Sequence, residues 1–121
     1  MLIAVCHCGD VRLQVAARPE SLTECNCSIC RRYAARWAYY TRKTAQVLSD
    51  PDKVGVYIWG DRMLEFYHCK RCGCLTHSES VEKTDDSRIA VNARMMSPDD
   101  VADVRLKFFD GADTWQYVDE H

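Results

Sequence analysis

The eight cysteines of this chain fall into three short clusters, and the spacing within each cluster is typical of a metal site. A gap of two residues lets the backbone turn so that two thiolates face one point, about 2.3 Å from a zinc ion. The same gaps suit disulfides poorly, because a disulfide needs a specific Cα separation and torsion. The clusters are Cys6-His7-Cys8-Gly9, Cys25-Asn26-Cys27-Ser28-Ile29-Cys30 and Cys69-Lys70-Arg71-Cys72-Gly73-Cys74.

Length and charge exclude several classes of protein. The 121 residues predict one domain over residues 1–121. A net charge of −2 and a pI near 6.0 argue against a nucleic-acid partner. No apolar run approaches the ~20 residues that cross a bilayer, so no membrane partner is expected. Eight cysteines without a signal-peptide pattern predict a reducing, cytoplasmic location rather than a secreted disulfide framework.

Alternation of apolar and polar residues predicts a mainly β fold with antiparallel strands and one or two short helices. Ser97 and Pro98 have the pattern of an N-cap and a first helical residue, and a second short helix is expected after Ser28, through Arg31 to Ala35. The expected strands lie in segments 11–15, 37–40, 54–59, 64–67, 88–93 and 104–109.

Two arrangements of metal sites fit the eight cysteines. In the first, all eight form two closed sites of four thiolates each. In the second, one closed site uses a cysteine pair from the first cluster and a pair from the third, the middle cluster forms an open site with three thiolates, and Cys74 is spare. An open position matters because catalytic zinc sites leave one coordination position to water or substrate. The closed site of the second arrangement consists of Cys6, Cys8, Cys69 and Cys72, and the open site consists of Cys25, Cys27 and Cys30.

The middle cluster is followed directly by Arg31 and Arg32. Cationic neighbours and a helix N-terminus both favour the thiolate form of cysteine. A three-thiolate zinc site carries less negative charge than a four-thiolate site, so it can still accept an external thiolate. Two alternatives to a catalytic zinc site remain. Arg31 and Arg32 form only a solvated basic face, or the middle cysteine cluster binds no metal and senses redox state.

The three clusters, in this order, resemble the glutathione-dependent formaldehyde-activating enzyme family. The central Cys-x-Cys-x-x-Cys-Arg-Arg segment is the most specific part of the resemblance. The segments Val91-Asn92-Ala93-Arg94 and Phe109-Asp110-Gly111 add to it. The resemblance implies an Mss4-like fold of antiparallel β-sheets held by a structural zinc.

The resemblance also implies two zinc sites. It assigns the structural zinc to Cys6, Cys8, Cys69 and Cys72, and a labile zinc to Cys25, Cys27 and Cys30, where glutathione sulfur binds. The implied partners are a small thiol and an aldehyde, and the implied reaction is a carbon–sulfur lyase-type addition of glutathione to formaldehyde. Arg31 or Arg32 is expected to bind a carboxylate of the substrate through a charge-assisted pair. The rival interpretation is a non-enzymatic, zinc-stabilised binding module.

The remaining candidate residues have structural interpretations. Trp37, Tyr39, Tyr40, Tyr57 and Trp59 are interpreted as core and sheet-face residues rather than as a binding platform. His7 is expected to point away from the metal. His68 and His77 are expected on the surface, with a role as general base as the alternative.

Overall fold

The computed structural model describes residues 1–119 and contains two β-sheets. The smaller sheet is antiparallel, with the strand order β1-β2-β5. In β2 the side chains of Leu13 and Val15 are buried while Arg12 is exposed, which is the alternation that the sequence indicated. The three strands are β1 (Leu2–Val5), β2 (Arg12–Val15) and β5 (Ala45–Val47).

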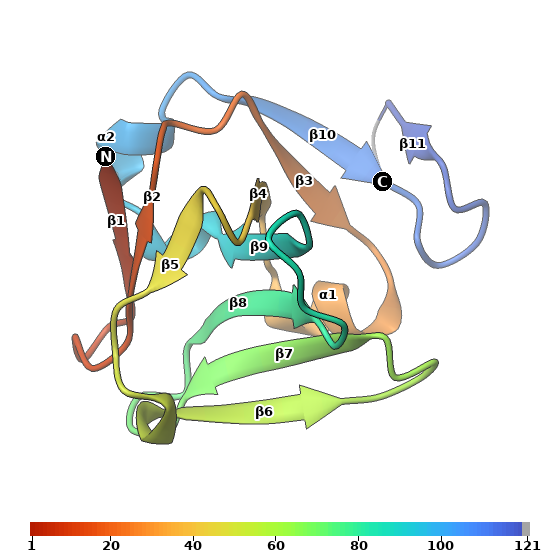
Figure 1. Ribbon diagram of the computed structural model, residues 1–121. Helices are drawn as coiled ribbons and strands as arrows, with labels where there is room; N and C mark the ends of the chain where they lie inside the picture. Colours follow the sequence, from red (N-terminus) through yellow and green to blue (C-terminus); the bar gives the residue numbers. More distant parts are fainter. Residues whose placement is uncertain (120–121) are drawn as a thin grey trace.

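The larger sheet has the strand order β11-β10-β3-β4-β9-β8-β7-β6. Figure 1 shows it curving from β10 and β3 at the top to β6, β7 and β8 at the bottom, with the short helix α1 at its open side. Its strands are β3 (Ser21–Cys25), β4 (Trp37–Thr41), β6 (Val54–Ile58), β7 (Leu64–Cys69), β8 (Leu75–Ser80), β9 (Arg88–Asn92), β10 (Arg105–Phe109) and β11 (Tyr117–Val118).

The helices are few and short. They are α1 (Ser28–Tyr33), α2 (Pro98–Val101) and the 3-10 turns η1 (Pro51–Lys53) and η2 (Ala93–Met95). Helix α2 begins after Ser97 with Pro98 in its first turn, as predicted. Helix α1 ends at Tyr33, two residues before the expected end at Ala35, because its C-cap residue Ala34 has a left-handed φ of 53°.

The mainly β class with short helices is therefore confirmed, with differences in detail. Strands β3 and β10 pair in parallel, whereas antiparallel pairing was expected throughout. The chain can make this pairing because β4 to β9 and α2 lie between the two strands in sequence. Five strands were not predicted, namely β1, β3, β5, β8 and β11. Strand β8 shows no alternation because its first five residues are all buried.

Two buried clusters fill the interior. The larger one packs the small sheet against the large sheet and includes Cys6 and Cys69. The smaller one lies beneath α1, and the partly buried Cys25, Cys27 and Ile29 pack against it. Its members are Cys30, Ala35, Trp37, Phe66, Leu75 and Ala90. Within residues 1–119, no helix is long and apolar enough to cross a membrane.

Candidate metal centres and ligand cavity

The sulfur atoms of Cys6, Cys8, Cys69 and Cys72 lie within 4.8 Å of one another. The turn between β1 and β2 supplies the first pair, and the turn between β7 and β8 supplies the second. The Sγ–Sγ distances are 3.7 Å from Cys6 to Cys8 and 3.5 Å from Cys8 to Cys69. Four thiolates around zinc at ~2.3 Å are about 3.8 Å apart, so this donor set fits a tetrahedral zinc ion.

Backbone N–H groups hold these sulfur atoms in place. Val11 N donates to Cys6 Sγ at 3.3 Å, and the N–H groups of Arg71 and Cys72 donate to Cys69 Sγ at 3.3 and 3.4 Å. The backbone N–H of Cys74 hydrogen-bonds to the Cys72 thiol and lowers its pKa to about 5. Such hydrogen bonds favour the thiolate, which is the form that binds metal.

The sulfur atoms of Cys25, Cys27 and Cys30 form a second group within 4.8 Å. Cys27 caps α1, since its Sγ accepts a hydrogen bond from Cys30 N at 3.4 Å. In the part of the chain that the structure describes, Cys74 belongs to neither group. The sulfur atoms are thus gathered as in the second arrangement considered above, with four in one group and three in the other. His7 is exposed and outside both groups.

Hydrogen bonds within the group shift the pKa values of Cys25 and Cys30 in opposite directions. A hydrogen bond with the Cys30 thiol lowers the pKa of Cys25 to about 5, although burial acts in the opposite direction. Hydrogen bonds from the backbone N–H groups of Cys27 and Gly111 contribute to this lowering. The same contact with Cys25, together with burial, raises the pKa of Cys30 well above its ordinary value. Trp37 Nε1 donates to Cys30 Sγ at 3.4 Å. The hydrogen bonds within the cluster therefore favour the thiolate form at Cys25.

The loop between β10 and β11 closes one side of this group. Asn26 Nδ2 donates to Asp110 Oδ1 at 3.0 Å, and Asn26 Oδ1 accepts from Ala112 N at 3.0 Å. These bonds hold Gly111 against the cluster so tightly that a Cβ there would lie 2.6 Å from Cys25 Sγ. Only glycine allows this approach.

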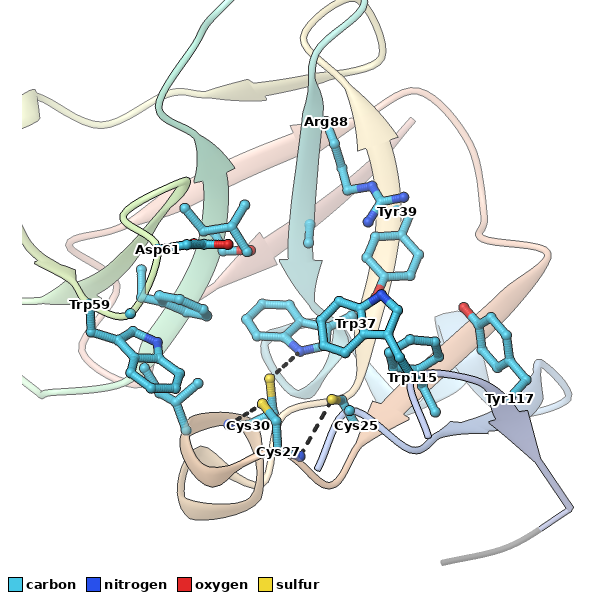
Figure 2. A pocket seen from close by; sticks show the side chains of 18 residues that line it. Cys25, Cys27, Cys30, Trp37, Tyr39, Trp59, Asp61, Arg88, Trp115 and Tyr117 are labelled. Atoms are coloured by element: carbon cyan, nitrogen blue, oxygen red, sulfur yellow. Dashed lines mark hydrogen bonds between the residues drawn. The ribbon is translucent and has the colours of Figure 1, made fainter. Parts of the chain in front are cut away.

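The three cysteines lie at one end of a cavity of about 580 Å³. One row of paired residues across four strands lines it, because Tyr39 pairs with Ala90, Ala90 with Ser78, and Ser78 with Phe66. The side chains of Ala90 and Ser78 are small and leave an open space, which the larger side chains of Tyr39 and Phe66 border on either side. Figure 2 shows the cysteines at the bottom of the cavity, Trp37 in the middle, and Arg88 over the Tyr39 ring at the top.

Several lining residues were not expected to be functional. Trp37, Tyr39 and Trp59 line the cavity, and Tyr40 and Tyr57 do not. Trp37 is also buried in the smaller core cluster, which agrees with its interpretation as a core residue. Phe66, Arg88, Trp115 and Tyr117 were not among the candidate residues, and Phe109 was noted only as part of a segment that resembles the family. Strand pairing brings them together from distant segments, and none belongs to a cysteine cluster.

Arg31 and Arg32 lie on α1, exposed, and neither lines the cavity. Arg32 Nη1 donates instead to the carbonyl oxygen of Ser28 at 2.8 Å. Their expected contact with a carboxylate stays a prediction, and Arg88 is the arginine that lines the cavity. His77 is buried, contrary to the surface position expected for it, and it does not line the cavity either.

Comparison with known proteins agrees with the resemblance in the cysteine segments. The family model of the glutathione-dependent formaldehyde-activating enzyme matches residues 1–110. A crystal structure of a Rhodobacter sphaeroides protein is similar, with a TM-score of 0.71 and 25% sequence identity. The similarity covers 87% of this chain and 99% of that chain. The family match confirms the resemblance.

Proposed function

Because this chain belongs to the glutathione-dependent formaldehyde-activating enzyme family, we propose that it joins a small thiol, such as glutathione, to an aldehyde. In this carbon–sulfur lyase-type reaction the thiol sulfur forms a bond to the carbonyl carbon. The carbon–oxygen π bond breaks, the oxygen gains a proton and the thiol gives one up, so the product is an S-hydroxyalkyl thioether. With formaldehyde and glutathione the product is S-hydroxymethylglutathione.

One observation carries the proposal, namely a group of three thiols that opens into a cavity instead of being closed by a fourth thiol. Cys25, Cys27 and Cys30 would hold a zinc ion, which supplies a positive centre that favours the thiolate form of a substrate thiol. Cys6, Cys8, Cys69 and Cys72 would hold a second, structural zinc ion.

The residues around the three thiols have separate roles in this reaction. Trp37 fixes Cys30 through its indole N–H, and Asn26 holds the loop that bears Gly111. Trp37 and Phe66 exclude water from the inner wall of the cavity, which brings thiol and aldehyde together without competing solvent. These contacts position the reactants.

Metal content tests the proposed sites. We expect two zinc ions per chain, of which a mild chelator or added glutathione removes one, because three thiolates bind zinc less tightly than four. Cys27→Ser should contain one zinc ion, while the control Cys74→Ser should contain two. Two ions held equally tightly would favour the rival function, a non-enzymatic zinc-stabilised binding module.

Exchange spectroscopy by NMR tests the activity, because it measures the interconversion of formaldehyde, glutathione and their adduct at equilibrium. The zinc-loaded protein should raise the exchange rate above that of the uncatalysed reaction, and Cys74→Ser should do the same. Cys27→Ser should return the rate to the uncatalysed value. A Cys27→Ser protein with the full rate would refute the catalytic role of the three cysteines.

A further inference from the structure

The cavity is much larger than a one-carbon aldehyde requires. Its volume of about 580 Å³ lies within the roughly 300–1,000 Å³ of pockets that hold drug-sized molecules. Formaldehyde adds only one carbon and one oxygen to a thiol, and both would lie beside the cysteines, so the remaining space must hold the rest of the thiol together with any larger group on the aldehyde. Most of the cavity extends away from that end, along the side chains of β4, β7 and β9.

The walls of this remaining space are mainly apolar and aromatic, and its polar side chains are those of Asp61, Ser78 and Arg88. The three tryptophans of the chain, Trp37, Trp59 and Trp115, all line it. Figure 2 shows Trp59 and Trp115 on opposite sides of the cavity, with Trp37 between them. Several lining side chains are exposed although they are apolar, and exposed apolar surface of this kind marks a ligand site. These are Tyr39, Trp59, Leu64, Trp115 and Tyr117.

Trp115 is kept at the cavity in an unfavourable conformation. Its φ is 58°, in the left-handed region that bulky residues rarely adopt, and 71% of its surface is exposed. The indole ring contacts the Phe109 ring edge-on at 5.1 Å, and the backbone N–H of Trp115 donates to the carbonyl oxygen of Asp110 at 2.7 Å. Backbone strain that is maintained at a cavity points to a function for the strained residue.

Arg88 supplies a positive charge at the opposite end of the cavity from the cysteines (Figure 2). Its guanidinium lies 4.3 Å from the centre of the Tyr39 ring. Among residues 1–119, no carboxylate lies within ion-pair distance of it. The stacked guanidinium is therefore oriented, and its donors are available to a carboxylate of the ligand.

Residue positions along β4 indicate how far the cysteine end of the cavity lies from its Arg88 end. Trp37 hydrogen-bonds to Cys30, and the Tyr39 ring stacks against the Arg88 guanidinium. These two aromatic residues are two positions apart on β4. They project to the same side of the sheet, and their Cα atoms are roughly 7 Å apart. A ligand with its sulfur at the cysteines can reach Arg88 only by passing the aromatic walls.

We propose that the cavity takes the adduct of a thiol with an aromatic or branched apolar aldehyde. The sulfur lies at Cys25, Cys27 and Cys30, the apolar group lies against Trp37, Trp59 and Trp115, and a carboxylate binds Arg88. This inference rests on the proposed function, since it names the substrate class of the same site. The carboxylate comes either from the thiol or from the aldehyde.

Stable thioethers test the apolar part without any turnover. Isothermal titration calorimetry of the zinc-loaded protein should give S-benzylglutathione a Kd roughly 10-fold or more below that of S-methylglutathione, because the benzyl group buries additional apolar surface. Since every tryptophan lines the cavity, binding should also change the intrinsic fluorescence. Trp115→Gly removes the ring at a position whose φ suits glycine, and it should reduce the preference for the benzyl probe.

Arg88→Met tests the charged part, with Arg18→Met as the matched control, because Arg18 is exposed and outside the cavity. The two probes are S-benzylglutathione and S-(4-carboxybenzyl)glutathione. Arg88→Met should bind at least one of them roughly 10-fold more weakly than the unsubstituted protein does, and Arg18→Met should bind both as tightly as the unsubstituted protein. If S-benzylglutathione is weakened, the thiol supplies the carboxylate. If only S-(4-carboxybenzyl)glutathione is weakened, the aldehyde supplies it.

Equal affinities for the methyl and benzyl probes would overturn the inference, as would an Arg88→Met protein that binds every probe as tightly as Arg18→Met. Neither result would contradict the proposed function, because that function is tested by the exchange rate and by its loss in Cys27→Ser. Conversely, a benzyl preference in a protein that does not accelerate exchange would contradict the proposed function and leave the binding site supported.

Discussion

At the scale of single residues, the approach of Gly111 to the three-cysteine group is the tightest constraint in the site. The Asn26–Asp110 contact and the bonds from Thr114 to the other carboxylate oxygen of Asp110 fix this loop. Asn26 hydrogen-bonds to Asp110 and, with Thr114, holds the pKa of that carboxyl below its ordinary value. The loop therefore cannot move outward freely to make room for a larger residue.

Gly111→Ala should weaken the three-cysteine site selectively. The added Cβ would lie 2.6 Å from Cys25 Sγ and 3.3 Å from Cys27 Cβ, so Cys25 must move. We expect loss of the weakly held zinc, retention of the other, and a destabilisation of about 1–3 kcal/mol from overpacking. Metal content and chemical denaturation measure these changes. Ala112→Ser, at the exposed neighbouring residue, is the control, and a Gly111→Ala protein with two zinc ions would contradict the prediction.

At the scale of elements, β8 is the most deeply buried strand of the large sheet. It pairs with β7 and β9, and its residues from Leu75 to Glu79 are all buried. His77 lies in its middle with 1% of its surface exposed, stacked on Tyr67 at 4.6 Å, and with Nδ1 2.8 Å from the Thr76 hydroxyl. Burial lowers the pKa of His77 to about 4.

His77 should make the fold less stable as the pH falls. The unfolded chain protonates this imidazole below its ordinary pKa of 6.5, while the folded chain remains neutral down to about pH 4. The stability contribution is complete above pH 6.5 and decreases as the pH falls toward 4, by about 2 kcal/mol at pH 5. Unfolding free energies at pH 7 and pH 5 measure it.

His77→Phe is the matched variant, because it retains a ring against Tyr67 and does not titrate. Proton competition for the cysteines affects both proteins alike, so the difference between their pH dependences isolates the imidazole. Identical pH dependences for the two proteins would contradict a neutral buried His77.

At the scale of the whole molecule, the four-cysteine group joins the two sheets. Cys6 and Cys8 belong to the hairpin of β1 and β2, and Cys69 and Cys72 belong to the turn that ends β7. Cys6 and Cys69 are also members of the larger buried cluster. A metal ion at this point would fix the small sheet to the large one.

Cys69→Ala should therefore unfold the chain or make it aggregate. Structural zinc contributes about 10–16 kcal/mol of apparent binding free energy in small domains, which is comparable to the whole stability of a typical domain at about 5–15 kcal/mol. Circular dichroism and size-exclusion chromatography of Cys69→Ala and of the control Cys74→Ser provide the comparison. A soluble Cys69→Ala protein with an unchanged Tm would refute a structural metal at this position.

Local sequence determined the features that depend on neighbouring residues. The gaps between cysteines bring Cys6 near Cys8 and Cys27 near Cys30, because only a turn of backbone separates each pair. The Ser97-Pro98 helix start and the alternation in β2 were likewise predictable, since caps and strand faces depend on residues close in sequence. The family resemblance came from the same local segments.

Tertiary structure alone decided which distant residues share a site. The sequence left two groupings of the cysteines open, and the packing of the small sheet against the large one places Cys69 beside Cys8, while Cys74 belongs to neither group. The row from Tyr39 through Ala90 and Ser78 to Phe66 depends on the registers of three strand pairs, and the parallel pairing of β10 with β3 brings Gly111 to Cys25. No local pattern encodes such contacts, because they arise from the packing of segments that are far apart in the chain.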